Sequence, residues 1–231
     1  MSFSAQVGFL KGLMELRLLN YGELEDQMEL STLTRLQSIC MEQSEMNRLP
    51  AWMGALANLL YLQLEGVMLV AWSLAGFKSL QSLDISSCNV VQVIDSMGQL
   101  TSLTSLRIVD CRLAELSSSI SRLQNLRDLD LDCSFFPEFP RALQALRAPE
   151  LRRVCLEGNS RLSRQNDAAR EDKGYRALPV KAADLAWLLH HPRLQTVSIT
   201  ATKAEAAELQ AFKQELCKVS GCDVLNIKCF G

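Results

Sequence analysis

The sequence lacks the short motifs that most enzyme families need. It contains no GxxxxGK[S/T] phosphate loop, no GxGxxG, no HExxH and no GxSxG. It has only two histidines, His190 and His191, which stand side by side before Pro192. Histidine ligands and catalytic bases need partners that converge on them, and none is indicated, so we expect structural or surface roles for both. We predict a protein that is not an enzyme and has no cofactor or metal site.

Cysteine pairs, glycosylation sites and membrane signals are also missing. The eight cysteines form no CxxC pair and show no zinc-site spacing, and no Asn-x-Ser/Thr acceptor occurs. Free thiols without glycosylation favour a reducing compartment, so we predict a cytoplasmic protein, with the nucleus as an alternative. No apolar run approaches the roughly 18 residues that span a bilayer, and the N-terminus has no signal-peptide pattern. We therefore expect no membrane partner.

A nine-residue pattern, Leu-x-x-Leu-x-Leu-x-x-Cys, recurs through the chain. Copies begin at residues 13, 36, 59, 80, 103, 126 and 151, with steps of 23, 23, 21, 23, 23 and 25 residues, and an eighth begins at 194. Alternation within Leu-x-Leu indicates a short strand with one buried face. A unit of this size cannot bury its leucines alone, so neighbouring copies must stack into a parallel sheet. The connections contain Pro50 and Pro140, which favour short helical turns after them.

This pattern resembles the leucine-rich repeat family in its typical 23-residue form, closely over residues 10–160 and loosely over 181–231. The segment SLQSLDISSCNVVQVIDSMGQLTSL is similar to repeats of intracellular plant-type immune receptors, and LPAWMGALANLLYLQL is similar to the Ras-group leucine-rich repeat scaffolds. The resemblance implies an α/β solenoid, a curved horseshoe with the parallel sheet on its concave face and short helices or turns on its convex face. It also implies scaffolding or ligand sensing in signalling or innate immunity.

The ninth position of each copy departs from the family pattern. Asparagine is usual there and satisfies backbone groups of the adjoining turn, but only one copy here has it, at Asn159. Cys88 and Cys111 take this position in neighbouring copies. We expect these two cysteines to stack one repeat apart as buried residues and not to form a disulfide.

Three parts of the chain differ in composition. We predict a repeat array of about seven units over residues 1–159, a polar charged insertion over 160–180, and helix–strand units over 181–231 that close the solenoid. The last part includes a helix after Thr202, with Leu209, Phe212 and Leu216 on one face, and a final strand over 223–230. No separate capping segment precedes the first copy, so either residues 1–9 form a cap or the chain belongs to a longer protein.

The segment LRDLDLDC places three aspartates, Asp128, Asp130 and Asp132, at alternate positions. Their spacing is superficially that of a calcium loop, but the segment lacks the glycine turn and the closing glutamate. Because the leucines hold it in a strand, all three carboxylates should face solvent. Taking positions 3, 5, 7 and 8 of the first seven copies as solvent-facing gives nine acids against three arginines. The candidate binding residues are Glu42, Tyr61, Glu65, Asp84, Arg107, Asp110, Asp128, Asp130, Asp132, Arg153 and Glu157.

These observations support a non-enzymatic recognition or scaffold module that binds a basic protein or peptide on its acidic concave face. The sign of the charge disfavours nucleic acid. Alternatively, the acids only keep an exposed sheet soluble. Two other classes stay open: a sensor or substrate-recognition fragment of an immune receptor, kinase or ubiquitin ligase, and a structural array that self-associates weakly through its N-terminal edge instead of staying monomeric. The insertion at 160–176, which carries five Lys and Arg residues, is a hypothetical lid over the acidic face.

Overall fold

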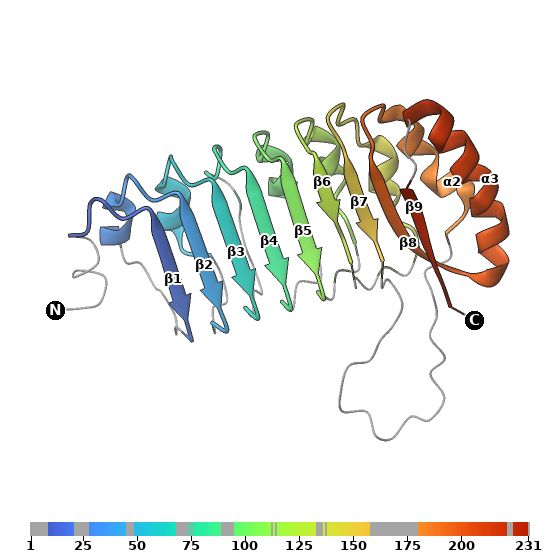
Figure 1. The fold of residues 1–231 in the computed structure, drawn as a ribbon. Helices are drawn as coiled ribbons and strands as arrows, with labels where there is room; N and C mark the ends of the chain where they lie inside the picture. Colours follow the sequence, from blue (N-terminus) through green and yellow to red (C-terminus); the bar gives the residue numbers. More distant parts are fainter. Residues whose placement is uncertain are drawn as a thin grey trace, which may run out of the picture.

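The strands form one open parallel sheet in which their spatial order is their order along the chain (Figure 1). The computed structural model describes residues 9–20, 28–44, 49–67, 74, 76–88, 95–111, 113, 115–132, 136, 138–157, 180–220 and 224–230. The nine strands are β1 (Glu15–Leu19), β2 (Ser38–Glu42), β3 (Tyr61–Glu65), β4 (Ser82–Ser86), β5 (Ser105–Val109), β6 (Asp128–Asp130), β7 (Arg153–Leu156), β8 (Thr196–Thr202) and β9 (Val224–Phe230).

Strand register follows the repeat alignment. The third residue of each copy lies beside the third residue of the next, as in Glu15 beside Ser38 and Asp128 beside Arg153. The register also holds across the shortest step, where Tyr61 pairs with Ser82, and across the longest, where Arg153 pairs with Thr196. The predicted stacking of these eight copies is therefore confirmed, and β9 adds a further strand beside β8.

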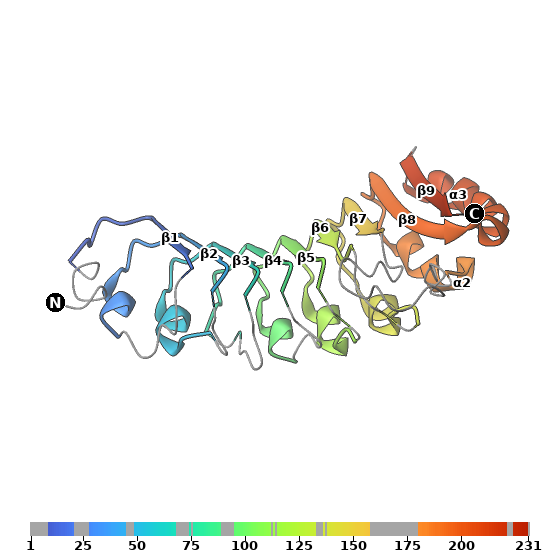
Figure 2. The same cartoon turned by 90° about the horizontal axis from the view of Figure 1, so that it is seen from below.

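Short 3-10 helices connect the strands on one side of the sheet (Figure 2). Pro50 and Pro140, with φ of −61° and −69°, immediately precede two of them. Proline favours this position because its φ is already helical and it has no N–H to leave unpaired. The predicted helical turns are thus confirmed. The 3-10 helices among the described residues are η1 (Met28–Thr32), η2 (Ala51–Ala55), η3 (Asp95–Gln99), η4 (Ser118–Arg122), η5 (Arg141–Ala145) and η6 (Ala186–His190).

The array is flatter than the horseshoe that the family resemblance implies. In Figure 2 the strands from β1 to β5 lie almost in one row, and the row turns only from β6 onward. Curvature in a solenoid follows from the difference in width between its two sides. The 3-10 turns here are slender, with about 2 Å rise per residue, so they spread the outer side little more than the strands spread the inner side.

Leucines at the first, fourth and sixth positions of the copies fill the space between the sheet and the helices. In β4, for example, Leu83 and Ile85 are fully buried, and Leu80 before the strand is fully buried too. Side chains between them point away from the core, which gives the alternating burial pattern of β1 and β4. Each fully buried leucine stabilises the fold by about 2 kcal/mol relative to an exposed one. One continuous core therefore runs along the array.

A left-handed residue follows each of the first five strands. Asn20, Gln43, Gly66, Ser87 and Asp110 have φ between 50° and 62°. Each donates its backbone N–H to the seventh-position carbonyl of the next copy, for example from Asn20 to Glu42 at 3.0 Å. The turn thus continues the hydrogen bonding of the sheet beyond its strands. Asparagine, aspartate and glycine tolerate this conformation better than most residues.

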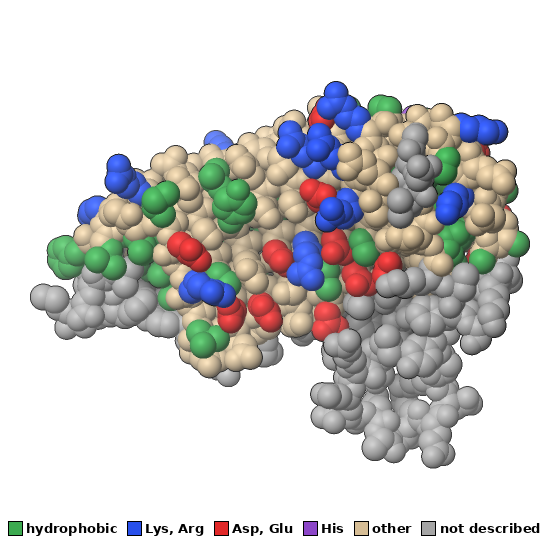
Figure 3. All heavy atoms as spheres, in the orientation of Figure 1, with side chains coloured by type: hydrophobic (Ala, Val, Ile, Leu, Met, Phe, Trp, Pro, Cys, Tyr) green, Lys and Arg blue, Asp and Glu red, His purple; other side chains and the backbone are tan. Residues whose placement is uncertain are grey.

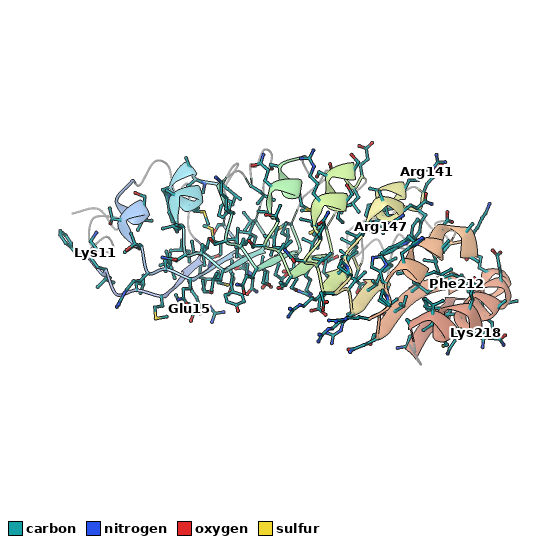
Figure 4. All side chains as sticks on the ribbon, turned by 90° about the horizontal axis from the view of Figure 1, so that it is seen from above. Lys11, Glu15, Arg141, Arg147, Phe212 and Lys218 are labelled. Atoms are coloured by element: carbon teal, nitrogen blue, oxygen red, sulfur yellow. The ribbon has the colours of Figure 1, made fainter. Side chains whose placement is uncertain are left out.

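The C-terminal units continue the same sheet and carry longer helices. A short helix α2 (Ala182–Leu185) leads into η6, and α3 (Lys203–Ser220) packs against η6, β8 and β9. The helix predicted after Thr202 is therefore confirmed, and Phe212 lies on its inner side (Figure 4) with only 5% of its surface exposed. Residues 158–179, which include the hypothetical lid, lie outside the described residues, and the proposed division into three parts stays a prediction.

His191 joins η6 to the preceding repeat. It is fully buried, its Nδ1 lies 3.0 Å from the Trp187 carbonyl, and its Nε2 lies 3.4 Å from the Ala148 amide nitrogen. Nδ1 must therefore donate to the carbonyl, and Nε2 must accept from the amide, which is the pattern of a neutral imidazole. Burial lowers the pKa of His191 below its ordinary 6.5. The structural role expected for this histidine is the role it has here.

This arrangement predicts a pH-dependent stability that depends on His191. The unfolded chain takes up a proton near pH 6.5 and the folded chain only at lower pH, so the free energy of unfolding should fall as pH drops below about 6.5. Urea unfolding between about pH 7.5 and 5.5 should show this loss in the wild type and in the control variant His190→Gln. His191→Gln should be less stable than the wild type, because it loses the buried hydrogen bonds, and its stability should fall less over the same pH range. An equal slope in all three proteins would contradict the prediction.

Candidate functional site

Side chains that point away from the leucine core form one surface, here called the sheet face. It comprises positions 3, 5, 7 and 8 of the copies that contain β1 to β7. Figure 3 views the molecule from this side and shows acidic side chains gathered toward the carboxyl-terminal ends of the strands. The eleven predicted binding residues all belong to this surface. Tyr61 on β3 is half exposed, at 50%, and is the large aromatic side chain of the set.

Arg107 lies at the centre of the sheet face between two aspartates. Parallel register places it on β5 directly beside Asp84 on β4 and Asp130 on β6. Its Nη1 lies 3.1 Å from both carboxylate oxygens of Asp84, and its Nε lies 3.4 Å from Oδ2 of Asp130. Three neighbouring strands are therefore joined by one charged side chain.

Asp130 lies in a partly buried position that disfavours its charge. Burial raises the pKa of this carboxyl above its ordinary 3.8, while Arg107 and the Asp132 amide, which donates to Oδ1 at 3.1 Å, act against the shift. Burial also raises the pKa of the neighbouring Cys155 thiol to about 12. This thiol therefore stays protonated at neutral pH and is a poor nucleophile.

The other two arginines of the sheet face also pair with acids on adjacent strands. Arg17 lies 3.0 Å from Glu42, and Arg153 lies 3.8 Å from Asp128. The sequence predicted nine acids and three arginines on this surface but did not show which of them pair. The structure shows that each arginine already neutralises part of the surface, so the residual negative charge is more localised than the sequence indicated.

Four acids of the sheet face lie at the carboxyl-terminal ends of β3, β5, β6 and β7, whereas the β4 copy has Ser86 and Ser87 there. We call Glu65, Asp110, Asp132 and Glu157 the acidic row. Within the described part of the chain, no ion pair joins the first three to a lysine or arginine. Ser87 donates its hydroxyl to Asp110 at 3.2 Å, so this carboxylate is held in place without being neutralised. These acids can accept charge-assisted hydrogen bonds from a cationic ligand.

Cys88 and Cys111 form a pair of buried thiols behind the sheet face, here called the cysteine ladder. Both are free, and each lies within hydrogen-bond reach of a carbonyl in the preceding repeat, Leu64 at 3.4 Å and Ile85 at 3.6 Å. The Val67 amide donates to Cys88 at 3.3 Å. Burial raises the pKa of the Cys111 thiol to about 12. The prediction of stacked, unoxidised cysteines is confirmed, and the thiols take over the bonding expected of asparagine.

Two further properties of the described residues bear on function. No group of three or more His, Cys, Asp or Glu side chains in this part of the chain is arranged to hold a metal ion. No helix among these residues combines the length and apolar character needed to cross a membrane.

No protein-family model matches the sequence, and no curated protein matches it either. Among solved structures, the chain is similar to a leucine-rich repeat protein of Leptospira interrogans, with a TM-score of 0.66, 22% identity and coverage of 96% of this chain. The match covers 50% of the Leptospira protein, so this chain spans half of its length. Together with the repeat register, this likeness decides the fold. The chain is a leucine-rich repeat solenoid.

Two other leucine-rich repeat structures are also similar to this solenoid. The leucine-rich repeat domain of the type III effector XopL matches with a TM-score of 0.63 and 17% identity, covering 97% of this chain and 79% of that one. The plant peptide hormone receptor RGFR1, solved in complex with RGF2, matches with a TM-score of 0.58 and 18% identity, covering 97% of this chain and 34% of the receptor. At these identities the likeness concerns the fold.

The Arg107 cluster predicts a pH-dependent effect of its removal. Because the folded-state pKa of Asp130 is above its unfolded value, ionised Asp130 costs stability at neutral pH, and the cost is relieved as pH falls through the folded pKa. Removing the guanidinium enlarges this cost. Arg107→Gln should lower the free energy of unfolding by about 1 kcal/mol at pH 7, with a smaller difference near pH 4.

Urea unfolding at both pH values measures this effect. Arg35→Gln is the matched control, because Arg35 is exposed and makes no ion pair among the described residues. A loss that is equal at the two pH values would show that Arg107 acts through packing and not through its charge.

Proposed function

We propose that this solenoid is a non-enzymatic recognition module that binds a basic segment of a protein partner along the acidic row. The observation that carries the proposal is the position of Glu65, Asp110 and Asp132, which lie at the carboxyl-terminal ends of β3, β5 and β6 and have no cationic partner among the described residues. Asp110 and Asp132 are like charges on neighbouring repeats, which costs stability, and a basic ligand relieves that cost.

The sheet face has the physical properties of a recognition surface. Its backbone is fixed by parallel pairing on both sides of β2 to β8, so ordering the surface on binding costs little conformational entropy. Its acids attract a basic segment before contact and raise the association rate, an effect that salt screens. Tyr61 and the aliphatic part of Arg107 offer apolar contact area beside the charges. This combination fits a partner with lysines or arginines and at least one apolar side chain.

The structural neighbours support the class of function. RGFR1 was solved with RGF2, and the XopL structure is a leucine-rich repeat domain of an effector. Both are consistent with a repeat array that binds a protein or peptide, as a separate scaffold or as the recognition part of a larger receptor, kinase or ubiquitin ligase. Signalling and innate immunity remain proposals of the same kind, and we propose no nucleic-acid or membrane partner.

A reducing compartment suits the cysteine ladder, so we place this function in the cytoplasm or the nucleus. The S–H of Cys88 can donate to the Leu64 or the Ser86 carbonyl, and the S–H of Cys111 can donate to the Ile85 or the Val109 carbonyl. Oxidation would remove these donors and leave buried carbonyls with fewer partners, at a cost of about 1 kcal/mol or more for each.

The test compares two triple variants with equal loss of negative charge. Glu65→Gln/Asp110→Asn/Asp132→Asn removes the unpaired part of the acidic row, and asparagine tolerates the left-handed backbone at residue 110. Glu115→Gln/Glu138→Gln/Glu215→Gln removes three exposed acids that lie outside the sheet face. Binding of a fluorescent lysine-rich peptide, measured by anisotropy at low salt, should weaken about tenfold or more in the first variant. Equal affinities in the two variants would reject the acidic row as the binding surface.

We further propose weak self-association through the N-terminal edge as a second candidate. The first repeat exposes Phe9, Leu10, Met14 and Leu19 by 53% to 75% each, and among the described strands β1 has a neighbour on one side only. An unpaired edge next to apolar side chains favours contact between copies.

Light scattering over a concentration series tests this second candidate. The apparent mass should rise with concentration for the wild type, and Met14→Gln/Leu19→Gln should remain monomeric. The double variant removes apolar contacts without touching the acidic row, so its peptide affinity serves as the control for folding. A wild type that stays monomeric at all concentrations overturns the candidate.

A further inference from the structure

A pair of arginines lies at the opposite end of the same strands. Arg127 and Arg152 occupy the second position of their copies, just before β6 and β7, and the Arg152 amide donates to the Arg127 carbonyl at 2.7 Å. Neighbouring strands are about 4.8 Å apart, so the two side chains start from adjacent points. Figure 3 shows Lys and Arg side chains gathered over the amino-terminal ends of these strands. We call Arg127 and Arg152 the arginine pair.

The arginine pair is exposed and has no acidic partner in the described part of the chain. The acids nearest to it in the sequence are already engaged. Asp128 pairs with Arg153 at 3.8 Å, and Glu150 pairs with Arg193. The fold thus leaves two guanidinium groups of like charge side by side, with all their donors available to an oxyanion.

The solenoid itself does not need charge at this position. Copies other than those of β6 and β7 carry uncharged residues there, and they are Met14, Gln37, Leu60, Gln81, Thr104 and Gln195. The arginines are therefore confined to two adjacent strands of a position that the fold fills with neutral side chains elsewhere. Adjacent guanidinium groups can together bind a carboxylate with charge-assisted hydrogen bonds.

The arginine pair and the acidic row lie at opposite ends of the strands. The seventh position comes five residues after the second, a distance of about 16 Å in an extended chain. Asp132 and Glu157 of the acidic row stand on the same two repeats as Arg127 and Arg152. A segment that lies along β6 and β7 meets positive charge at one end and negative charge at the other.

We infer that the arginine pair is a second binding element, which takes acidic residues of the same protein partner whose basic residues bind the acidic row. The inference rests on the proposed function for the basic half of the partner. It narrows the ligand from a basic segment to an extended segment with opposite charges about 16 Å apart. The two elements together fix the direction in which that segment lies, because a reversed segment places like charges in contact.

Three fluorescent Gly/Ser peptides test this inference: one with a lysine block, one with a glutamate block, and one with both blocks separated by about five residues, or 16 Å when extended. The full chain should bind the bipolar peptide about fivefold more tightly than the lysine peptide at low salt. In Arg127→Gln/Arg152→Gln this ratio should fall to about one. Glutamine already occupies this position in three other copies, so the fold should accommodate it in the variant.

The matched control is Arg35→Gln/Arg141→Gln, which loses the same charge at exposed positions away from the arginine pair. Arg141 lies on the helical side of the array (Figure 4). The control should keep the fivefold ratio of the wild type. A ratio of about one in the wild type, or an equal fall of the ratio in both variants, overturns the inference.

The remaining outcomes separate the inference from the proposed function. If the lysine peptide binds and the bipolar peptide gains nothing, the acidic row stands and the arginine pair fails. A second outcome is that the lysine peptide fails to bind while the glutamate peptide binds the wild type and not Arg127→Gln/Arg152→Gln. In that case the arginine pair is a binding element and the acidic row is not. A single-stranded oligonucleotide that binds through the pair more tightly than the glutamate peptide would assign it to nucleic acid and overturn the inference. Failure of all three peptides overturns both.

Discussion

Each repeat depends on its neighbours to bury its leucines, and this dependence determines the surface as well as the core. Leu83 on β4 and Leu106 on β5 are covered only because adjacent copies lie on both sides in fixed register. A slip of one residue would expose these leucines and bury the charges between them, at a cost of several kcal/mol per repeat. The third, fifth and seventh positions therefore point away from the leucine core whatever residue they hold, and their identities are free to serve binding.

Such a core explains which features could be predicted from the sequence. The positions of leucine alone gave the strand register, including the steps of 21 and 43 residues, because no other alignment buries them all. The same positions placed every candidate binding residue on one surface. The flatness of the array was not predictable in this way, since it depends on how wide the 3-10 connections are.

The distribution of charge on the surface could not be derived from spacing either. Whether Arg107 extends toward Asp84, Asp130 or solvent depends on side-chain rotamers and on the distance between strands. Because it bridges the two aspartates, it offsets one of their two negative charges, while Asp110, Asp132 and the arginine pair lie outside these ion pairs, beyond the ends of β5, β6 and β7. The sequence did contain a sign of the arginine pair, because charged residues at the second position are confined to two adjacent copies. The second position lies just before each strand, so the list of solvent-facing strand positions does not include the arginine pair.

The accessibility of the cysteine ladder depends on whether the central repeats stay packed together. Cys88 and Cys111 lie in the middle of the solenoid, nearly inaccessible and held as protonated thiols. Neither can react with an alkylating reagent until the repeats on either side separate. In a chain whose repeats each contact only their neighbours, ends can fray while the middle stays closed. The rate at which these two thiols become modified therefore reports the opening of the central repeats, separately from fraying at either end.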